Sequence, residues 1–214
     1  MKFRVLHEAR LVADNLALDF VNTSTGRNVS ESWDDYLIDA MEVLMWLRRA
    51  KAIDETRFRA MTRVVANDKG ASDAFLRSAL RLRGALAGLF DSLIKGLAPV
   101  ESDLRVLNDV LATARNAERV TWTPQGIALV AAWDGRSLDD ALWPIALTVE
   151  QILTSKALLK VKECGSPTCK WLFLDTSKNG SRRWCQMEVC GNREKGRRRL
   201  KRERESDQQA TSRL

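Results

Sequence analysis

The chain has 214 residues, of which 45% are hydrophobic and 29% charged, and its formal net charge is +7. This composition favours a globular protein with one good-sized domain and room for a small module. No apolar run reaches the roughly 18 residues of a membrane-spanning helix, and charges interrupt the apolar start of the chain, so we expect no signal peptide, no membrane contact and a cytoplasmic location.

The first 160 residues have mostly helical patterns. Apolar side chains in 11–23 recur near a period of 3.6 residues, which predicts a helix. The segment 32–50 begins with a serine, places Asp34 and Asp35 in its first turn and ends with two arginines, and both ends suit the helix dipole. Capping and stop residues predict further helices over about 54–67, 72–95 and 102–115.

The pattern then changes to short strands. The sequence RVTWTPQGIALVAAW (119–133) predicts two strands around a Pro-Gln-Gly turn, and Ser137 is expected to begin a last long helix that ends near Leu159. We therefore expect an α+β fold. Its mainly helical N-terminal domain with a small β-hairpin would span residues 1–160, and a C-terminal module would span 161–214.

Asp19 lies among apolar neighbours in LALDFVNT (16–23). We expect it to make a buried hydrogen bond or a contact with Asn22 or Thr23, with a place in a ligand pocket as the alternative.

The C-terminal module holds all four cysteines, Cys164, Cys169, Cys185 and Cys190, with the spacing C-x4-C-x15-C-x4-C. Two close pairs of cysteines can bind one ion from two sides, and Zn²⁺ favours a tetrahedral set of four thiolates. Two disulfides, unrelated buried thiols and an iron–sulfur cluster are the alternatives. Reduced thiols are usual in the cytoplasm, so we favour one structural zinc ion per chain. Asn179-Gly180 also predicts a tight turn, and thus a hairpin between the two pairs.

Most of the positive charge follows the cysteines. Residues from 156 onward hold 16 Lys/Arg against 7 Asp/Glu, and 193–204 alone hold eight against two. Such a segment predicts a helix without an apolar stripe, which would lie in solvent or on phosphates. A solvated tail is the alternative, and some arginines would instead offset the charge of a zinc–thiolate centre. Trp171 and Trp184 could stack on bases, but packing around a small metal core is the simpler expectation.

The strings CKWLFLDTSKNGSRRWC and CGNR (190–193) resemble the CGNR zinc finger, and LALDFVNT with LWPIALTVEQILTSKALLKVKEC (142–164) resembles the ABATE domain that accompanies it. The resemblance implies that the four cysteines are the zinc ligands, that 1–160 is ABATE-like and 161–214 a CGNR-type finger with a basic helix, and that the protein is a bacterial regulator of transcription whose finger binds DNA.

Our leading hypothesis is therefore a regulator that binds double-stranded DNA and is not an enzyme, since no phosphate loop or nucleophile elbow occurs. Its N-terminal domain would sense a small-molecule effector or form a homodimer. An RNA-binding or ribosome-associated zinc protein and a protein-interaction adaptor with a purely structural finger are the alternatives. The candidate DNA contacts combine phosphate-binding cations with two residues able to read bases: Arg182, Arg183, Asn192, Arg193, Lys195, Arg197, Arg198, Arg199 and Lys201.

Overall fold

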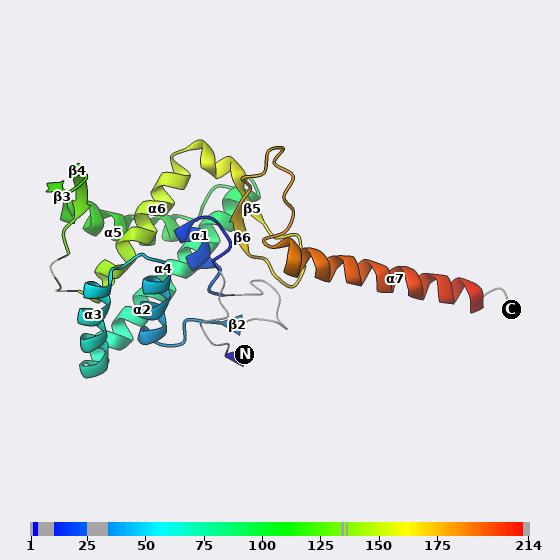
Figure 1. Cartoon of the computed structure of the whole chain (residues 1–214), viewed down its shortest axis with the longest axis horizontal. Coiled ribbons are helices and arrows are strands. Elements are labelled where there is room, and N and C mark those ends of the chain that lie inside the picture. Colours follow the sequence, from blue (N-terminus) through cyan, green and yellow to red (C-terminus); the bar gives the residue numbers. More distant parts are fainter. Residues whose placement is uncertain (1, 4–10, 25–33, 134, 136, 212–214) are drawn as a thin grey trace.

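The computed structural model describes residues 2–3, 11–24, 34–133, 135 and 137–211. Its helices form a bundle, and one long helix projects from an end of that bundle (Figure 1). None of the helices in these described ranges is long and apolar enough to cross a membrane. In chain order the α-helices are α1 (Leu16–Val21), α2 (Ala40–Arg49), α3 (Glu55–Asn67), α4 (Lys69–Ile94), α5 (Glu101–Ala117), α6 (Trp143–Leu153) and α7 (Asn192–Thr211).

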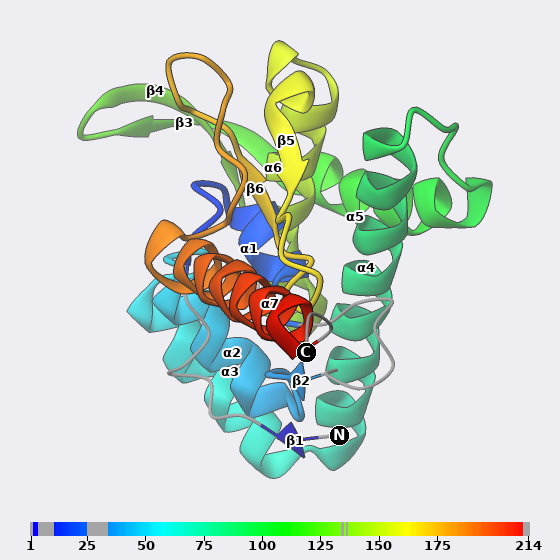
Figure 2. The same cartoon turned by 90° about the vertical axis from the view of Figure 1, so that its right-hand side faces the viewer.

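The short helix α1 lies at the centre of the bundle, against α4 and α6 (Figures 1 and 2). It is shorter than the predicted 11–23 because the Asn15 side chain caps it, accepting hydrogen bonds from the amides of Ala17 and Leu18. The side chain of Phe20 is fully buried and its ring lies 5.3 Å from that of Trp46 in α2. The motif LALDFVNT therefore forms the middle of the core.

Aspartates begin three of the helices. Asp39, Asp54 and Asp68 each accept a hydrogen bond of 2.8 Å from the backbone amide three residues later. The start predicted at Asp54 is confirmed. The start predicted at Ser72 is wrong by one turn, because Asp68 both ends α3 and caps α4.

The helix predicted over 32–50 begins later than expected. Asp35 belongs to the short strand β2 (Asp34–Asp35), which pairs in parallel with β1 (Lys2–Phe3). Its buried carboxylate accepts two hydrogen bonds, of 2.7 and 2.5 Å, from the guanidinium of Arg83 in α4. This ion pair holds Asp35 in the core, so it is not available for a helix N-terminus. The predicted cap Ser32 lies outside the described residues.

The helix predicted from Ser137 to Leu159 is three helices. Ser137 caps a 3-10 turn, η2 (Leu138–Leu142), and α6 follows with a proline in its first turn. Ser155 then caps a second 3-10 turn, η3 (Lys156–Lys160). Serine side chains that bond to nearby backbone amides compete with a continuous helix, which explains the breaks.

The predicted hairpin of two strands after α5 is confirmed. Strand β3 (Glu118–Thr123) pairs antiparallel with β4 (Gly126–Ala131). The hairpin lies at the end of the molecule opposite to α7 (Figure 1).

A third pair of strands joins the bundle to the cysteine-containing region. Strand β5 (Val161–Glu163) pairs antiparallel with β6 (Leu172–Leu174), and Phe173 is fully buried in the core that α1 and α6 also form. The Asn22 side chain exchanges two hydrogen bonds of 2.8 Å with the backbone of Leu172. The fold is thus α+β as expected. The division of the chain at residue 160 stays a prediction, and the core is continuous across it.

Candidate metal centre and nucleic-acid interface

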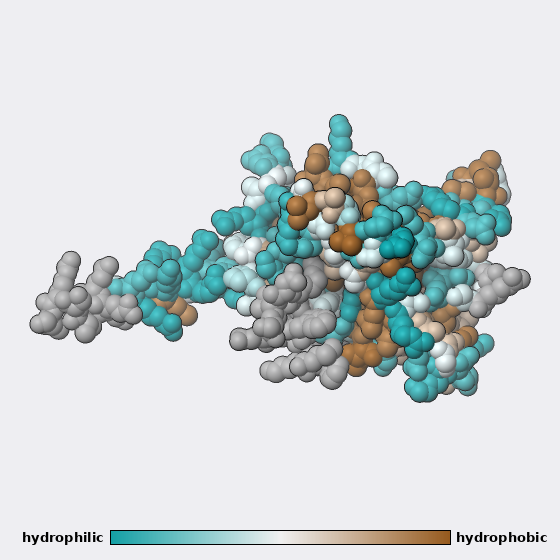
Figure 3. Space-filling model, turned by 180° about the vertical axis from the view of Figure 1, so that it is seen from behind, coloured by the Kyte–Doolittle hydropathy of each residue, from teal (hydrophilic) through white to brown (hydrophobic). Residues whose placement is uncertain are grey.

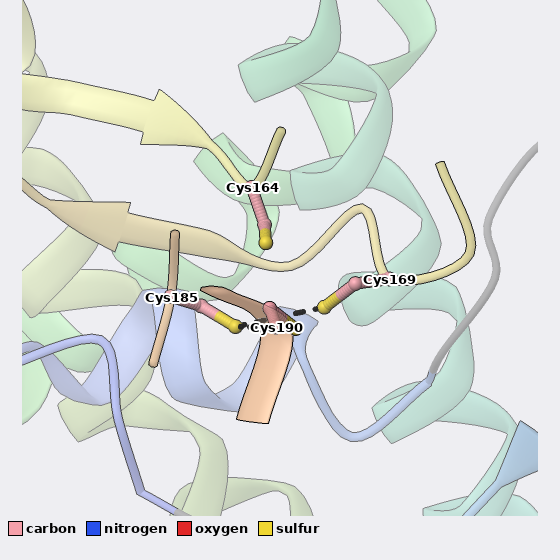
Figure 4. A group of neighbouring side chains, drawn as sticks. All are labelled: Cys164, Cys169, Cys185 and Cys190. Atoms are coloured by element: carbon pink, nitrogen blue, oxygen red, sulfur yellow. Dashed lines mark hydrogen bonds between the residues drawn. The ribbon is translucent and has the colours of Figure 1, made fainter. Parts of the chain in front are cut away.

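The four cysteines come from four different local structures. Cys164 directly follows β5, Cys169 lies in the turn that leads to β6, Cys185 ends a long loop, and Cys190 lies in η4 (Met187–Gly191), a π-helical turn that leads into α7. All four side chains are buried, and their sulfur atoms converge to within 4.8 Å of one another (Figure 4).

This geometry fits a single zinc ion. Zn–S bonds of about 2.3 Å in a tetrahedron place the sulfurs about 3.8 Å apart. The Cys169–Cys185 and Cys185–Cys190 sulfur distances are both 3.6 Å. A disulfide would need about 2.0 Å, so the disulfide alternative is wrong, and the convergence of all four thiols does not fit unrelated cysteines. Sulfurs this close enclose one ion, and the residues present can hold one zinc.

The sulfur atoms of Cys169 and Cys185, and of Cys185 and Cys190, lie at hydrogen-bonding distance. Hydrogen bonding with Cys169 and Cys185 lowers the pKa of Cys164, and hydrogen bonding with Cys164 raises the pKa of Cys185. A metal ion takes the place of the thiol protons, because the thiolate is the form that binds zinc.

The hairpin predicted between the two cysteine pairs is wrong, because the strands of this region form at a different place in the chain. Strands β5 and β6 enclose the first pair of cysteines, whereas the chain after β6 forms a loop around Asp175. Its carboxylate accepts hydrogen bonds from Lys162, from the Ser177 hydroxyl and amide, and from the Arg182 amide. Lys162 holds the pKa of Asp175 well below its usual range. These bonds replace the strand pairing that Asn179-Gly180 suggested, although Gly180 does adopt a positive φ in a turn.

Trp184 and Met187 explain the glycine of the CGNR motif. A Cβ at Gly191 would overlap the Met187 sulfur and come within 3.1 Å of the Trp184 ring. A Cβ at Gly165 would also come within 3.1 Å of that ring. Trp184 is half-buried and Trp171 buried, so the expected packing around the metal centre is what the structure shows.

The other motif residues also serve the finger itself. The Asn192 side chain donates to the carbonyl of Glu188, 3.1 Å away, and the Arg193 guanidinium donates to the Thr168 hydroxyl, also at 3.1 Å. Asn192 thus bonds to the backbone of the turn that leads into α7. Arg193 joins the start of α7 to the turn before Cys169.

A buried glutamate fixes the direction of α7. Glu194 is only 4% exposed and accepts a hydrogen bond of 3.2 Å from the fully buried Ser166 hydroxyl. Its other oxygen pairs with Arg197 at 2.7 Å. Since Ser166 lies in the turn between the first two cysteines, this contact ties the helix rigidly to the metal centre.

Arg182 is a correction to the predicted DNA-binding set. Its guanidinium donates to the carbonyls of Val12, Leu174, Trp184 and Cys185, and lies 4.5 Å from the centre of the Phe173 ring. These contacts use up its donors inside the protein, where they join the loop before α1 to the finger. Arg183 remains exposed, with its guanidinium 5.6 Å from the centre of the Trp184 ring.

The remaining predicted contacts lie on α7 and are exposed: Lys195, Arg197, Arg198, Arg199 and Lys201. Three of these pair with glutamates of the same helix, at 2.7 Å (Arg197), 2.8 Å (Arg199) and 3.7 Å (Lys201). Lys195 and Arg198, together with Arg202, form no ion pair with a residue that the structure describes. They share one side of α7, because their spacing is three and four residues.

Asp19 proves to be a structural residue of the core. Its carboxylate accepts hydrogen bonds from the amides of Val12 (2.7 Å) and Ala13 (3.0 Å), which organises the loop before α1. Of the two expected roles, the structure shows the buried hydrogen bond and not the contact with Asn22 or Thr23. Burial raises the pKa of Asp19 to about 6, despite these two hydrogen bonds.

Sequence reasoning missed three residues that hold the site together: Asn22, Ser166 and Glu194. Only Glu194 carried a signal, because an acidic residue in the first turn of a basic helix suits the helix N-terminus. The contacts of Asn22 and Ser166 are with residues distant in sequence.

Comparison with protein families agrees with this architecture. A family model for the CGNR zinc finger matches residues 160–203. A second family model, ABATE, described as "Putative stress-induced transcription regulator", matches residues 14–156. No curated protein matches the chain.

Proposed function

The chain belongs to the ABATE family and carries a CGNR zinc finger, and we propose that it regulates transcription by binding double-stranded DNA through α7. The observation that carries the proposal is the form of this helix. It projects from the bundle (Figures 1 and 2) and its described side chains beyond Glu194 are all exposed. A basic helix whose described side chains lie in solvent suits a groove lined by phosphates.

The zinc centre has a structural role in this proposal. Zinc would hold the turn that carries Ser166 against η4, and the Ser166–Glu194 contact then sets the direction of α7. When bound, the ion supplies folding energy to a module with few apolar residues of its own. The residues of the CGNR motif build this support, so we assign DNA contact to the cations beyond it.

The basic side chains lie on two sides of α7. Lys195, Arg198 and Arg202 share one side, and Arg197 and Lys201 share another, as their spacing shows. A helix in the major groove has phosphates of both strands beside it. Two basic sides therefore suit phosphate contact on both walls of the groove.

Gly196 supports a close approach between α7 and a partner. Glycine inside a helix costs about 1 kcal/mol relative to alanine, yet a Cβ at Gly196 would have no neighbouring atom within 4 Å. The packing of the described residues therefore does not require a glycine at position 196. We assign it to the point at which α7 comes nearest to DNA, as glycine permits close contact.

The proposal is tested by binding of a labelled duplex to the zinc-loaded full chain over a series of salt concentrations. With about five phosphate contacts, log affinity should fall against log salt with a slope of about −4 to −5. Replacing Lys195, Arg198 and Arg202 with Ala should flatten the slope by up to about 3. The matched control removes the same charge from the bundle, as Arg59→Ala, Lys69→Ala and Lys95→Ala, and should leave the slope unchanged.

Competitors separate the alternatives. Structured RNA that displaces the duplex at equal concentration would favour an RNA-binding protein. Absence of binding to either nucleic acid at physiological salt would favour an adaptor with a structural finger. Gly196→Leu should weaken duplex binding while α7 gains helicity, and unchanged binding would contradict the close approach assigned to this residue.

The other parts of the proposal concern the bundle and the cell. We place the protein in the bacterial cytoplasm, as a binding protein without catalysis, and assign effector sensing and homodimerisation to the N-terminal domain.

A further inference from the structure

The β3–β4 hairpin exposes an unusual number of large apolar side chains. Val120, Trp122, Ile127 and Leu129 are 73, 80, 75 and 58% exposed. In Figure 3, which shows the molecule from behind, hydrophobic residues gather over the hairpin at the upper right. Single exposed apolar residues are ordinary, but a contiguous group of this size marks an interaction surface.

These four side chains lie on one face. The strand register pairs Val120 with Leu129 and Trp122 with Ile127, and paired residues point to the same side of a sheet. We name this group of four residues the apolar face of the hairpin. The opposite face carries smaller or polar residues, among them Thr121 opposite Ala128.

The hairpin also lacks the features that protect exposed strands. Its sheet has only two strands in the described part of the chain, so both outer edges are open. A hairpin alone is marginally stable in water, and exposed edges are usually guarded by charges or covered. Among the paired residues on this side of the hairpin, only Glu118 at its base carries a charge, so another surface is needed to cover the four apolar side chains.

We propose that a second copy of this chain covers the apolar face, so that two hairpins pack face to face about a two-fold axis. Charge is the first argument for this partner. Identical copies repel each other mainly at the C-terminal region, because residues from 156 onward hold 16 Lys/Arg against 7 Asp/Glu and the rest of the chain is nearly balanced. At the base of the hairpin, Glu118 pairs with Arg115, which also pairs with Glu150. Within the hairpin segment 118–131 the two charged residues, Glu118 and Arg119, have opposite signs, so this segment is neutral and two copies can meet there.

Area is the second argument. An aromatic side chain alone can bury roughly 150–250 Å², and the four side chains together offer on the order of 500 Å² per copy. Two copies then bury on the order of 1,000 Å² in total, which reaches the lower limit of the area buried in specific interfaces. Face-to-face packing also sets each Trp122 against aliphatic side chains, which makes the face complementary to itself.

The hairpin lies at the opposite end of the molecule from α7 (Figure 1). Pairing through it leaves the basic helix of each copy uncovered. The inference does not rest on DNA binding, and the experiment that tests it contains no nucleic acid.

The test is the mass of the zinc-loaded full chain in solution, measured by sedimentation equilibrium over a range of protein concentrations. We expect a dimer with a dissociation constant in the micromolar range. Trp122→Glu should weaken it by at least about 30-fold, the loss typical of a central aromatic residue in an interface. Thr121→Glu adds the same charge to the same strand on the opposite face and should leave the dimer intact.

Hydrogen exchange provides a second measurement in case Trp122→Glu disturbs the hairpin itself. In the unchanged protein, amides of 118–131 should exchange more slowly as the protein concentration rises, while those of α3 should not change. A wild-type chain that stays monomeric throughout would overturn the proposal. Equal dimerisation of Trp122→Glu and wild type would also overturn it, as would loss of the dimer in Thr121→Glu.

Discussion

Replacing Asn22 with alanine should destabilise the protein more than any exposed substitution of the same kind. Asn22 is 2% exposed, and its side chain both donates to and accepts from the Leu172 backbone, each time at 2.8 Å. The two residues are 150 positions apart, and the bonds join α1 to β6. Alanine would leave the buried amide and the buried carbonyl of Leu172 without partners.

The expected cost follows from these two groups. A buried backbone group that loses its hydrogen-bond partner costs about 1–3 kcal/mol, so two such groups cost about 2–6 kcal/mol. The free energy of unfolding of a domain is only about 5–15 kcal/mol. Loss of Asn22 should therefore remove a large part of the stability of the whole chain, because β6 also carries the fully buried Phe173.

The assay is urea unfolding of the zinc-loaded protein, followed by circular dichroism at a fixed zinc concentration. The matched control is Asn67→Ala, because the Asn67 side chain also donates to a backbone carbonyl, that of Arg63 at 2.7 Å, but in an exposed position. The control should change the free energy of unfolding by less than about 0.5 kcal/mol. A loss below about 1 kcal/mol for Asn22→Ala would show that water or a small shift of β6 satisfies Leu172, and would refute the reasoning.

Three further predictions concern the metal, the core and the finger. Purified protein should contain one zinc per chain; Cys185→Ser should lose it and unfold α7 while α2–α5 keep their helical signal, as metal analysis and circular dichroism would show. Because burial raises the pKa of Asp19 to about 6, the native state binds more protons than the unfolded state between about pH 4 and 6. Stability should thus fall as pH rises through this window, and Asp19→Asn should flatten the change; an unaltered pH profile would contradict this. Gly191→Ala should lower the melting temperature, because its Cβ would overlap Met187. Gly196→Ala should raise the melting temperature, because no atom lies near its Cβ and alanine favours a helix. Equal shifts for the two variants would contradict this difference in packing.

The residues of the metal centre were predictable because their signal is local. Two cysteine pairs in one short segment restrict the chemistry to a few choices, and a resemblance to a known finger narrowed them to zinc. The caps of α3 and the β3–β4 turn were predictable for the same reason, as each depends on side chains within a few residues of the backbone they bond.

Contacts between distant segments were beyond the sequence. No residue close to Asp35 in the chain indicates that Arg83 binds the Asp35 carboxylate. Because of this contact, α2 begins at Ala40 and not in the segment that contains Asp35. Arg182 looked like one more basic residue before the finger, yet its guanidinium bonds to Val12, 170 positions away.

The ligand set, the fold class and the basic character of α7 could be predicted from the sequence. The composition and the short spacing between the cysteines restrict directly which ligands and charges the chain presents. The tertiary structure was needed to show which cations can contact a partner. The sequence does not distinguish an arginine whose guanidinium bonds to buried carbonyls from an arginine in solvent. The tertiary structure also decided that the finger shares its core with the bundle. The burial of Phe173 and the pairing of Leu172 with Asn22 arise when segments far apart in the chain exclude water together.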